Sequence, residues 1–247
     1  MLCFDRFELE RSLKVTDLKV RVKYKKGDRV RFLSHLDLAR VMRMSLKRAK
    51  WPVAITKGYS PKMRVSFYAP LPVGTSGEEE YMDVFLDQSG TDPVAASQIP
   101  NFLVQLTRTL SGALPEGFSV SQVFIAPDSE KPLESQILGS LYSVEIEEVK
   151  RGLVSSAVEA FFNEEQVLFD IGRPTGTRTV DLRRFVEYMR IEPDIVFGHN
   201  SLTLLMRIGH ENGRTVRPQW VIGSLSRFGL DIDTSEVIVD RLKLYFE

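Results

Sequence analysis

The sequence predicts an α+β protein built from two βαββαβ-like (ferredoxin-like) halves with antiparallel sheets. Three observations lead to this prediction. Segments with strand and helix periodicity follow one another as strand, helix, strand, strand, strand, helix, strand, and much of that order then repeats. A polar, proline-containing stretch at 127–136 separates the two series. The chain has 247 residues, which is enough for two small domains.

The first half follows an N-terminal extension, residues 1–18, and spans 19–130. Residues 18–26, LKVRVKYKK, alternate apolar and basic side chains, which predicts a strand with one buried face and one basic face. Ser34 and Asp37 form a capping-box-like pair that predicts a helix from His35 to Lys50. The other elements expected in this half are strands at 51–56, 64–69, 81–86 and 118–126 and a helix at 100–113.

The second half, residues 131–247, repeats much of this order. Its expected strands cover 140–148, 166–171, 179–186, 201–209 and 236–246, and its expected helices cover 152–163 and 217–229. Sequence identity between the halves is low, so the prediction concerns a structural repeat.

Several classes of protein are excluded or left without support by the composition. No run of about 18 apolar residues is present, and the charged N-terminus lacks an apolar signal core, so we expect no membrane segment and a cytoplasmic location. Cys3 is the single cysteine, which excludes a disulfide or an all-cysteine iron–sulfur cluster within the chain. His35, His199 and His210 show no metal-ligand spacing, so no metal site is predicted.

Basic and acidic residues are distributed unevenly along a chain whose formal net charge is zero. Residues 19–64 hold fifteen Lys and Arg against two Asp, and residues 65–148 hold two basic residues against thirteen acidic ones. Such segregation creates a local field that the net charge conceals. We expect the first segment to bind a polyanion. The second, with an acidic cluster at 78–83, is expected to face a protein partner or solvent.

One face of the predicted helix carries Arg40, Arg43, Lys47 and Lys50, spaced as i, i+3, i+7 and i+10. Like charges this close repel one another, and an anionic partner removes that cost. A solvated helix face is the alternative interpretation. The residues predicted to bind nucleic acid are Arg31, Ser34, His35, Arg40, Arg43, Lys47, Lys57, Tyr59, Lys62, Arg64 and Arg217.

Three further segments combine basic side chains with turn residues. In KGYSPKMRVSF, residues 57–67, the basic side chains surround Tyr59, whose ring can stack on a base. GRPTGTRTVDLRR, residues 172–184, holds four arginines but lacks the Walker spacing. RTVRP, residues 214–218, places Arg217 just before a predicted helix N-terminus, where backbone amides favour an anion. Each segment is either a phosphate contact or a loop shaped by its turn residues.

His35, just behind the predicted N-cap, is the candidate catalytic residue. The helix dipole disfavours its protonated form, and a neutral imidazole can exchange a proton or bind a phosphate or base. The alternative is that His35 packs while Ser34 and Asp37 close the cap. A Ser-His-Asp triad is not supported, because all three residues lie on one turn and triad partners converge from separate elements.

Specific motifs link the chain to a known family. They are FLSHLD at 32–37 before an Arg-rich helix, GYSP at 58–61, Ser66-Phe67, LPVG at 71–74, Glu80-Tyr81, VDLRRFV, TVRP and Arg241. Over about residues 19–245 the chain resembles the radical SAM-linked proteins, a domain of unknown function fused to or encoded beside radical SAM proteins. Ser60 stands where that family usually has Asn. The resemblance implies a radical SAM partner that carries the iron–sulfur cluster and S-adenosylmethionine, with no cofactor in this chain.

Taken together, these features predict an RNA-binding accessory module that works with a radical SAM enzyme in the modification of tRNA or rRNA. Two alternatives stay open. One is an enzyme that acts on RNA through His35, and the other is a protein–protein adaptor whose basic face docks an acidic partner.

Overall fold

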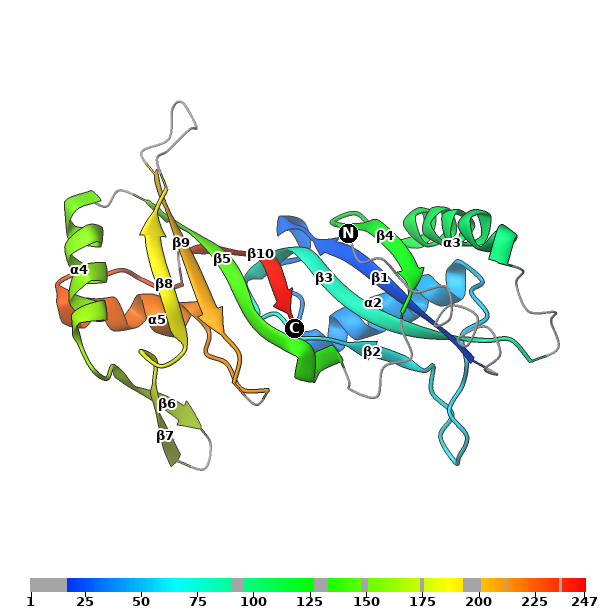
Figure 1. The fold of residues 1–247 in the computed structure, drawn as a ribbon, viewed down its shortest axis with the longest axis horizontal. Coiled ribbons are helices and arrows are strands. Elements are labelled where there is room, and N and C mark those ends of the chain that lie inside the picture. Colours follow the sequence, from blue (N-terminus) through cyan, green and yellow to red (C-terminus); the bar gives the residue numbers. More distant parts are fainter. Residues whose placement is uncertain are drawn as a thin grey trace. The chain divides into compact units, whose positions relative to one another are not determined.

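The structure is a computed structural model that describes residues 17–89, 96–126, 133–147, 151–173, 176–192, 201–211, 213–235 and 237–247. The chain divides into two compact units, Met1–Leu133 (unit 1) and Glu134–Glu247 (unit 2). The predicted α+β class is confirmed, because the described residues form four α-helices and antiparallel sheet (Figure 1). Most of the predicted extension lies outside the described residues, but Asp17 and Leu18 already belong to the first strand.

Unit 1 contains four strands and two α-helices in the described residues. They are β1 (Asp17–Lys26), α2 (His35–Arg48), β2 (Val65–Phe67), β3 (Thr75–Asp87), α3 (Ile99–Ala113) and β4 (Phe118–Ile125), with short 3-10 turns η1 (Asp28–Val30) and η2 (Ala96–Gln98). The strands lie in the order β4-β1-β3-β2, and every neighbouring pair is antiparallel.

The core of unit 1 follows from the two periodicities of its sequence. Alternate residues of β1 are buried, and Leu38, Met42 and Leu46 of α2 form an apolar stripe at helical spacing. The helix α3 contributes Leu106 and Leu110 to the same cluster. Both helices therefore cover one face of the unit 1 sheet.

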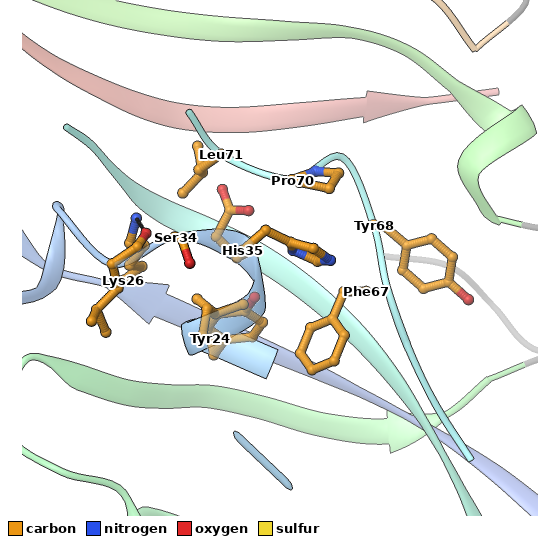
Figure 2. A pocket seen from close by; sticks show the side chains of 11 residues that line it. Tyr24, Lys26, Ser34, His35, Phe67, Tyr68, Pro70 and Leu71 are labelled. Carbon is orange, nitrogen blue, oxygen red and sulfur yellow. Dashed lines mark hydrogen bonds between the residues drawn. The ribbon is translucent and has the colours of Figure 1, made fainter. Parts of the chain in front are cut away.

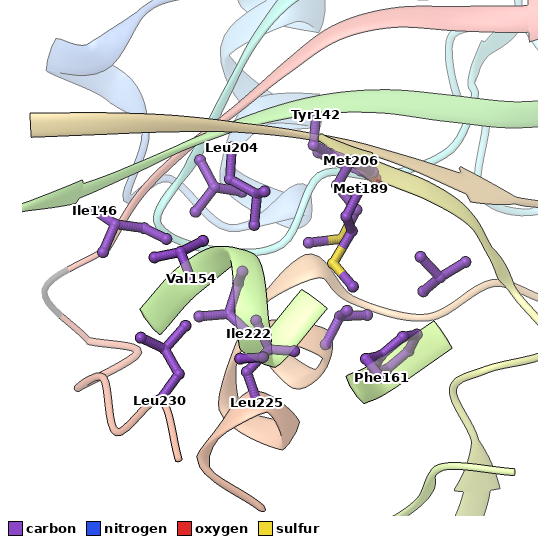
Figure 3. Close-up of a cluster of buried hydrophobic side chains, with 14 of the residues drawn as sticks. Tyr142, Ile146, Val154, Phe161, Met189, Leu204, Met206, Ile222, Leu225 and Leu230 are labelled. Atoms are coloured by element: carbon purple, nitrogen blue, oxygen red, sulfur yellow. The ribbon is translucent and has the colours of Figure 1, made fainter. Parts of the chain in front are cut away.

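Unit 2 has the same order of strands around two helices, interrupted by a hairpin. Its elements are η3 (Leu133–Gln136, which begins at the last residue of unit 1), β5 (Ile137–Glu147), α4 (Arg151–Asn163), β6 (Leu168–Arg173), β7 (Gly176–Asp181), β8 (Val186–Ile191), β9 (Ser201–Gly209), α5 (Pro218–Ser224), η4 (Leu225–Phe228) and β10 (Ile238–Phe246). The sheet order is β10-β5-β9-β8, all antiparallel, and β6 pairs with β7 apart from that sheet. Phe161 of α4 and Ile222 of α5 pack against the sheet residues Leu204 and Met206 (Figure 3).

Three predicted elements differ from the structure. Residues 51–56 do not form a regular strand: only the isolated bridges of Val53 with Leu86 and Ile55 with Met63 form there. The predicted strand 179–186 is two strands, because the Asp181 carboxylate accepts the backbone N–H groups of Val167 and Arg183 and the chain then turns. The predicted helix 217–229 is α5 followed by the 3-10 turn η4, which ends at Gly229 with a positive φ of 84°.

Candidate functional site

The helix α2 begins at a side-chain cap, as its sequence predicts. Ser34 has extended backbone angles, and its hydroxyl oxygen accepts the backbone N–H of Asp37 at 3.2 Å. The same hydroxyl donates to the Asp37 carboxylate at 2.7 Å. The predicted cap is confirmed, and both hydrogen-bonding roles of Ser34 serve to begin the helix.

A small hollow lies beside this cap, with Tyr24, Lys26, Ser34 and His35 among its walls (Figure 2). Its volume of about 10 Å³ admits a single water-sized sphere. Lys26 is buried, and its ammonium group donates to the carbonyl oxygens of Arg31, Leu33 and Thr75 at 2.9, 3.2 and 3.1 Å. These hydrogen bonds of Lys26 link the segment before α2 to the start of β3. The strict alternation of β1 was the signal that could have placed it on the buried face.

His35 packs against an aromatic ring at the edge of the hollow. Its imidazole is half-buried and meets the Phe67 ring edge-on, with centroids 5.8 Å apart and planes at 86° (Figure 2). The guanidinium of Arg43 lies over the same Phe67 ring, 5.9 Å from its centroid. The structure thus brings two predicted site residues, His35 and Arg43, onto one aromatic side chain of β2.

Outward-facing residues of α2 form a surface of cations and apolar side chains. We call this surface the α2 outer face; it consists of Leu36, Arg40, Arg43, Met44, Lys47 and Lys50 (at the end of the helix). Leu36 is 79% exposed and Met44 55%. None of the four cations forms an ion pair or a side-chain hydrogen bond with the described residues. The predicted basic stripe is therefore exposed and uncompensated in the described part of the chain.

Residues 57–62 form an exposed loop that carries Lys57, Tyr59 and Lys62, and the ring of Tyr59 is fully exposed. Thr56 closes the loop from both sides: its N–H donates to the Lys62 carbonyl at 2.8 Å, and its hydroxyl accepts the Lys62 N–H at 2.9 Å. The positive φ of 137° at Gly58 fits the requirement for glycine in this turn.

Arg31 and Arg64, two further predicted contacts, are engaged within the fold. Arg31 donates from Nε to the Gly74 carbonyl at 2.9 Å and lies 3.6 Å from the Asp28 carboxylate. Arg64 is ion-paired with Asp17, and its guanidinium lies over the Phe85 ring, 4.2 Å from the centroid. Arg31 thus contacts η1 and the loop before β3, and Arg64 contacts residues of β1 and β3, so both offer less free charge than the α2 outer face.

The basic face of β1 is paired with acids of β3, so the charges that are segregated in sequence are interleaved in space. The antiparallel register sets Arg21 opposite Asp83. Salt bridges join Arg21 to Asp83 at 2.7 Å, Lys23 to Glu79 at 2.6 Å and Lys25 to Glu78 at 2.5 Å. The expectation that all of 19–64 forms one polyanion-binding surface is wrong for β1.

The acidic cluster at 78–83 is only partly accessible, because Glu78 and Glu79 are partly exposed while its other two acids are not. Glu80 and Asp83 are buried. Asp83 accepts a bidentate pair of hydrogen bonds from Arg21 and a third from the Tyr68 hydroxyl at 2.8 Å. Burial, followed by the negative charge of Asp83, raises the pKa of Tyr68 above its ordinary value. The acids of β3 hold the sheet together, which the acidic composition of the segment could not reveal.

Arg217 belongs to unit 2 and is not part of the α2 outer face. It is the N-cap residue of α5 and makes no side-chain cap hydrogen bond. Its guanidinium lies over the Trp220 ring, 5.2 Å from the centroid. Because α5 has only seven residues and starts with Pro218, which has no N–H, its N-terminus offers little to an anion.

The comparisons with known proteins define the family. Residues 19–218 match the family described as "Uncharacterized protein conserved in bacteria (DUF2344)", and the chain belongs to that family. No curated protein matches the sequence.

Two solved structures are similar to this chain at low TM-scores. One is described as "Crystal Structure of a Cbf5-Nop10-Gar1 Complex", with a TM-score of 0.44 and 9% identity over 96% of this chain and 50% of that chain. The other, "Crystal Structure of an Unknown Protein from Galdieria sulphuraria", has a TM-score of 0.25 and 16% identity over 93% of this chain and 99% of that one. This chain thus spans about half the length of the first. At these TM-scores neither similarity carries an argument about function.

Two kinds of feature are absent from the described residues. No helix among them is long and apolar enough to cross a membrane. No group of three or more His, Cys, Asp or Glu side chains among them is arranged to hold a metal ion. Cys3 lies outside the described residues.

Proposed function

We propose that this chain binds RNA through the α2 outer face. One observation carries the proposal: Arg40, Arg43, Lys47 and Lys50 are all exposed, and none has a carboxylate partner among the described residues. By contrast, three basic residues of β1 are ion-paired with acids of β3. Because the charges of α2 are not neutralised as those of β1 are, the α2 outer face keeps a positive field at its contact with solvent.

The chemistry of the surface suits a structured nucleic acid. At a rise of about 1.5 Å per residue, Arg40, Arg43 and Lys47 extend over roughly 10 Å of α2, and Lys50 follows just after the helix ends. This length is enough to contact successive phosphates. Contact with phosphates would relieve the repulsion among the cations. Tyr59, fully exposed on its loop, offers a ring on which an unstacked base can lie. Leu36 and Met44 add apolar contact area between the charges.

The resemblance to the radical SAM-linked proteins supports a finer statement. In this proposal the chain is an accessory module that presents tRNA or rRNA, in the cytoplasm, to a radical SAM enzyme. That partner would supply the iron–sulfur cluster, S-adenosylmethionine and the reaction. This chain would contribute affinity for the RNA and would orient the RNA toward that partner.

The strand orders support a finer description of the fold as well. In unit 1 the order β4-β1-β3-β2, and in unit 2 the order β10-β5-β9-β8, place the first strand of each series between the fourth and the third. This is the arrangement of a split βαβ pair. We therefore infer two ferredoxin-like halves, the second with the β6–β7 hairpin inserted.

The proposal is tested by the salt dependence of RNA affinity. The variant Arg40→Ala/Arg43→Ala removes two cations of the α2 outer face, and Arg108→Ala/Arg227→Ala removes two exposed arginines from α3 and η4 as a charge-matched control. With unfractionated tRNA, the slope of log K against log salt should flatten by roughly 1.4–1.8 in the first variant, because two phosphate contacts are lost. The control should keep the wild-type slope. Equal slopes in all three proteins, with folding intact, would rule out this surface.

A further inference from the structure

Unit 2 contains a cleft of about 670 Å³ that the sequence did not predict. Its walls include the strand β7, the turn that follows it, and residues 211 and 213–215 before α5. The residues that matter here are Arg178, Thr179, Arg184, Arg214, Thr215 and Trp220. All of them except Trp220 come from the two arginine-containing segments 172–184 and 214–218, whose residues line the same hollow.

The cleft carries more positive than negative charge. Arg178, Arg184 and Arg214 line it together with Asp181 and Glu211. Glu211 is ion-paired with Arg184 at 2.5 Å. The Asp181 carboxylate accepts two backbone N–H groups, as described above, and is thereby occupied. Arg178 and Arg214 are exposed and have no acceptor among the described residues, which leaves two guanidinium groups free to bind an anion.

An aromatic wall stands beside these arginines. The Trp220 ring stacks on Phe169 with centroids 6.4 Å apart and planes inclined by 25°. Hydrogen bonds fix the two sides of the cleft: Thr179 donates to the Asp170 carboxylate at 2.6 Å, and Thr215 donates to the Gly209 carbonyl at 3.1 Å. The walls are therefore held in place before any ligand enters.

We propose that this cleft binds a nucleotide, with Arg178 and Arg214 on the phosphate and Trp220 beside the base. Guanidinium groups bind phosphate oxygens in pairs, and aromatic rings attract bases. The volume lies in the range of small-molecule sites, well above the needs of an isolated phosphate. The nucleotide is either one unstacked residue of an RNA chain or a free mononucleotide. In the first case the inference rests on the proposed function, and in the second it stands alone.

Trp220 supplies a direct readout of this cleft. The sequence has two tryptophans, and the other, Trp51, is buried in unit 1 with its indole N–H donated to Thr109 at 3.1 Å. In the full chain with Trp51→Phe, fluorescence reports Trp220 alone. Adenosine 5′-monophosphate and a ten-residue oligoadenylate are titrated separately, and circular dichroism verifies that each variant is folded.

At least one of the two probes should quench Trp220 saturably. Removing both arginines in Arg178→Ala/Arg214→Ala should weaken that binding by about tenfold or more, whereas the control Arg227→Ala should bind within about twofold of the parent. Quenching by both probes assigns the cleft to nucleotides in general, and quenching by the oligonucleotide alone assigns it to RNA. No saturable quenching by either probe, or equal quenching in the arginine variant, overturns the proposal.

A further variant separates this inference from the proposed function. Arg40→Ala/Arg43→Ala, made in the Trp51→Phe protein, changes only the α2 outer face. If tRNA affinity proves insensitive to that change while Trp220 is still quenched by adenosine 5′-monophosphate, the proposed function fails and the cleft stands. If tRNA affinity falls in that variant and Trp220 responds to neither probe, the cleft fails and the proposed function stands.

Discussion

His210 lies at the end of β9 in unit 2, where its ring is partly withdrawn from water. Its Nε2 is 3.0 Å from the hydroxyl oxygen of Ser140. Burial, followed by the positive charge of Arg241, lowers the pKa of His210 to about 4. The neutral imidazole is therefore the form that the fold stabilises, and protonation of this one side chain opposes folding.

This depressed pKa predicts a loss of stability in mild acid. Between about pH 6.5 and the folded-state pKa of about 4, the unfolded chain binds a proton at His210 that the folded chain does not. The free energy of unfolding should therefore fall as pH drops through this window, by on the order of 2 kcal/mol from this residue. Urea unfolding of the full chain at pH 7.5 and pH 5 measures the change in the free energy of unfolding. In His210→Gln the difference between the two pH values should shrink by a similar amount, and an unchanged difference would contradict the assignment.

His35 separates an RNA-binding module from an enzyme. Its ring packs on Phe67, and the neighbouring Ser34 hydroxyl is occupied by the helix cap. We expect purified protein to leave the lengths and nucleoside masses of total RNA unchanged. We expect His35→Ala to weaken RNA affinity by no more than about tenfold, the upper value for one ordinary hydrogen bond between neutral groups. Cleavage or a mass shift that the wild-type protein causes and His35→Ala abolishes would favour the enzyme instead.

At the scale of elements, three ion pairs join β1 to β3 at decreasing depth. The exposed fractions of the paired side chains are 13% and 2% for Arg21 and Asp83, 22% and 30% for Lys23 and Glu79, and 43% and 44% for Lys25 and Glu78. Removing the partner of a buried charge leaves that charge without compensation, whereas an exposed charge is resolvated by water.

The cost of removing each acid should follow this gradient. We expect Asp83→Ala to lower the free energy of unfolding by about 3 kcal/mol or more, because Arg21 and the Tyr68 hydroxyl both lose their partner. Glu78→Ala should cost less than about 1 kcal/mol, and Glu79→Ala should fall between the two. Urea unfolding of the three single variants gives the order. Similar costs for all three would show that burial does not set the strength of these pairs.

How much the sequence could predict differs between kinds of element. The helix α2 was predictable because its cap at Ser34 and its apolar stripe are local signals. The irregular stretch at 51–56 was not, because a strand exists only where a partner strand supplies its hydrogen bonds. For the same reason the ion pairs between β1 and β3 could not be predicted from the sequence. They depend on the register between the two strands, whose paired residues lie more than 50 positions apart in the chain. The arginines of the unit 2 cleft converge by the same long-range route.

For the whole molecule, a formal net charge of zero conceals two positive regions of different design. The α2 outer face is convex and wholly exposed, whereas the cleft of unit 2 is concave and contains an aromatic wall. The two units thus share an order of strands and helices but carry different positive surfaces. If both regions bind RNA, a helix face would hold successive phosphates while the cleft takes a single nucleotide.

If both regions bind tRNA, the losses of tRNA affinity caused by substitutions in each region should be additive. The residues of Arg40→Ala/Arg43→Ala and Arg178→Ala/Arg214→Ala belong to different units. Substitutions without shared partners add in free energy. With tRNA, each pair should flatten the slope of log K against log salt by roughly 1.4–1.8, and the fourfold variant should flatten it by roughly 3. Fluorescence anisotropy across a salt series measures all four proteins. If the fourfold variant shows no more loss than the α2 pair alone, tRNA does not use the cleft, and its ligand is then a free nucleotide.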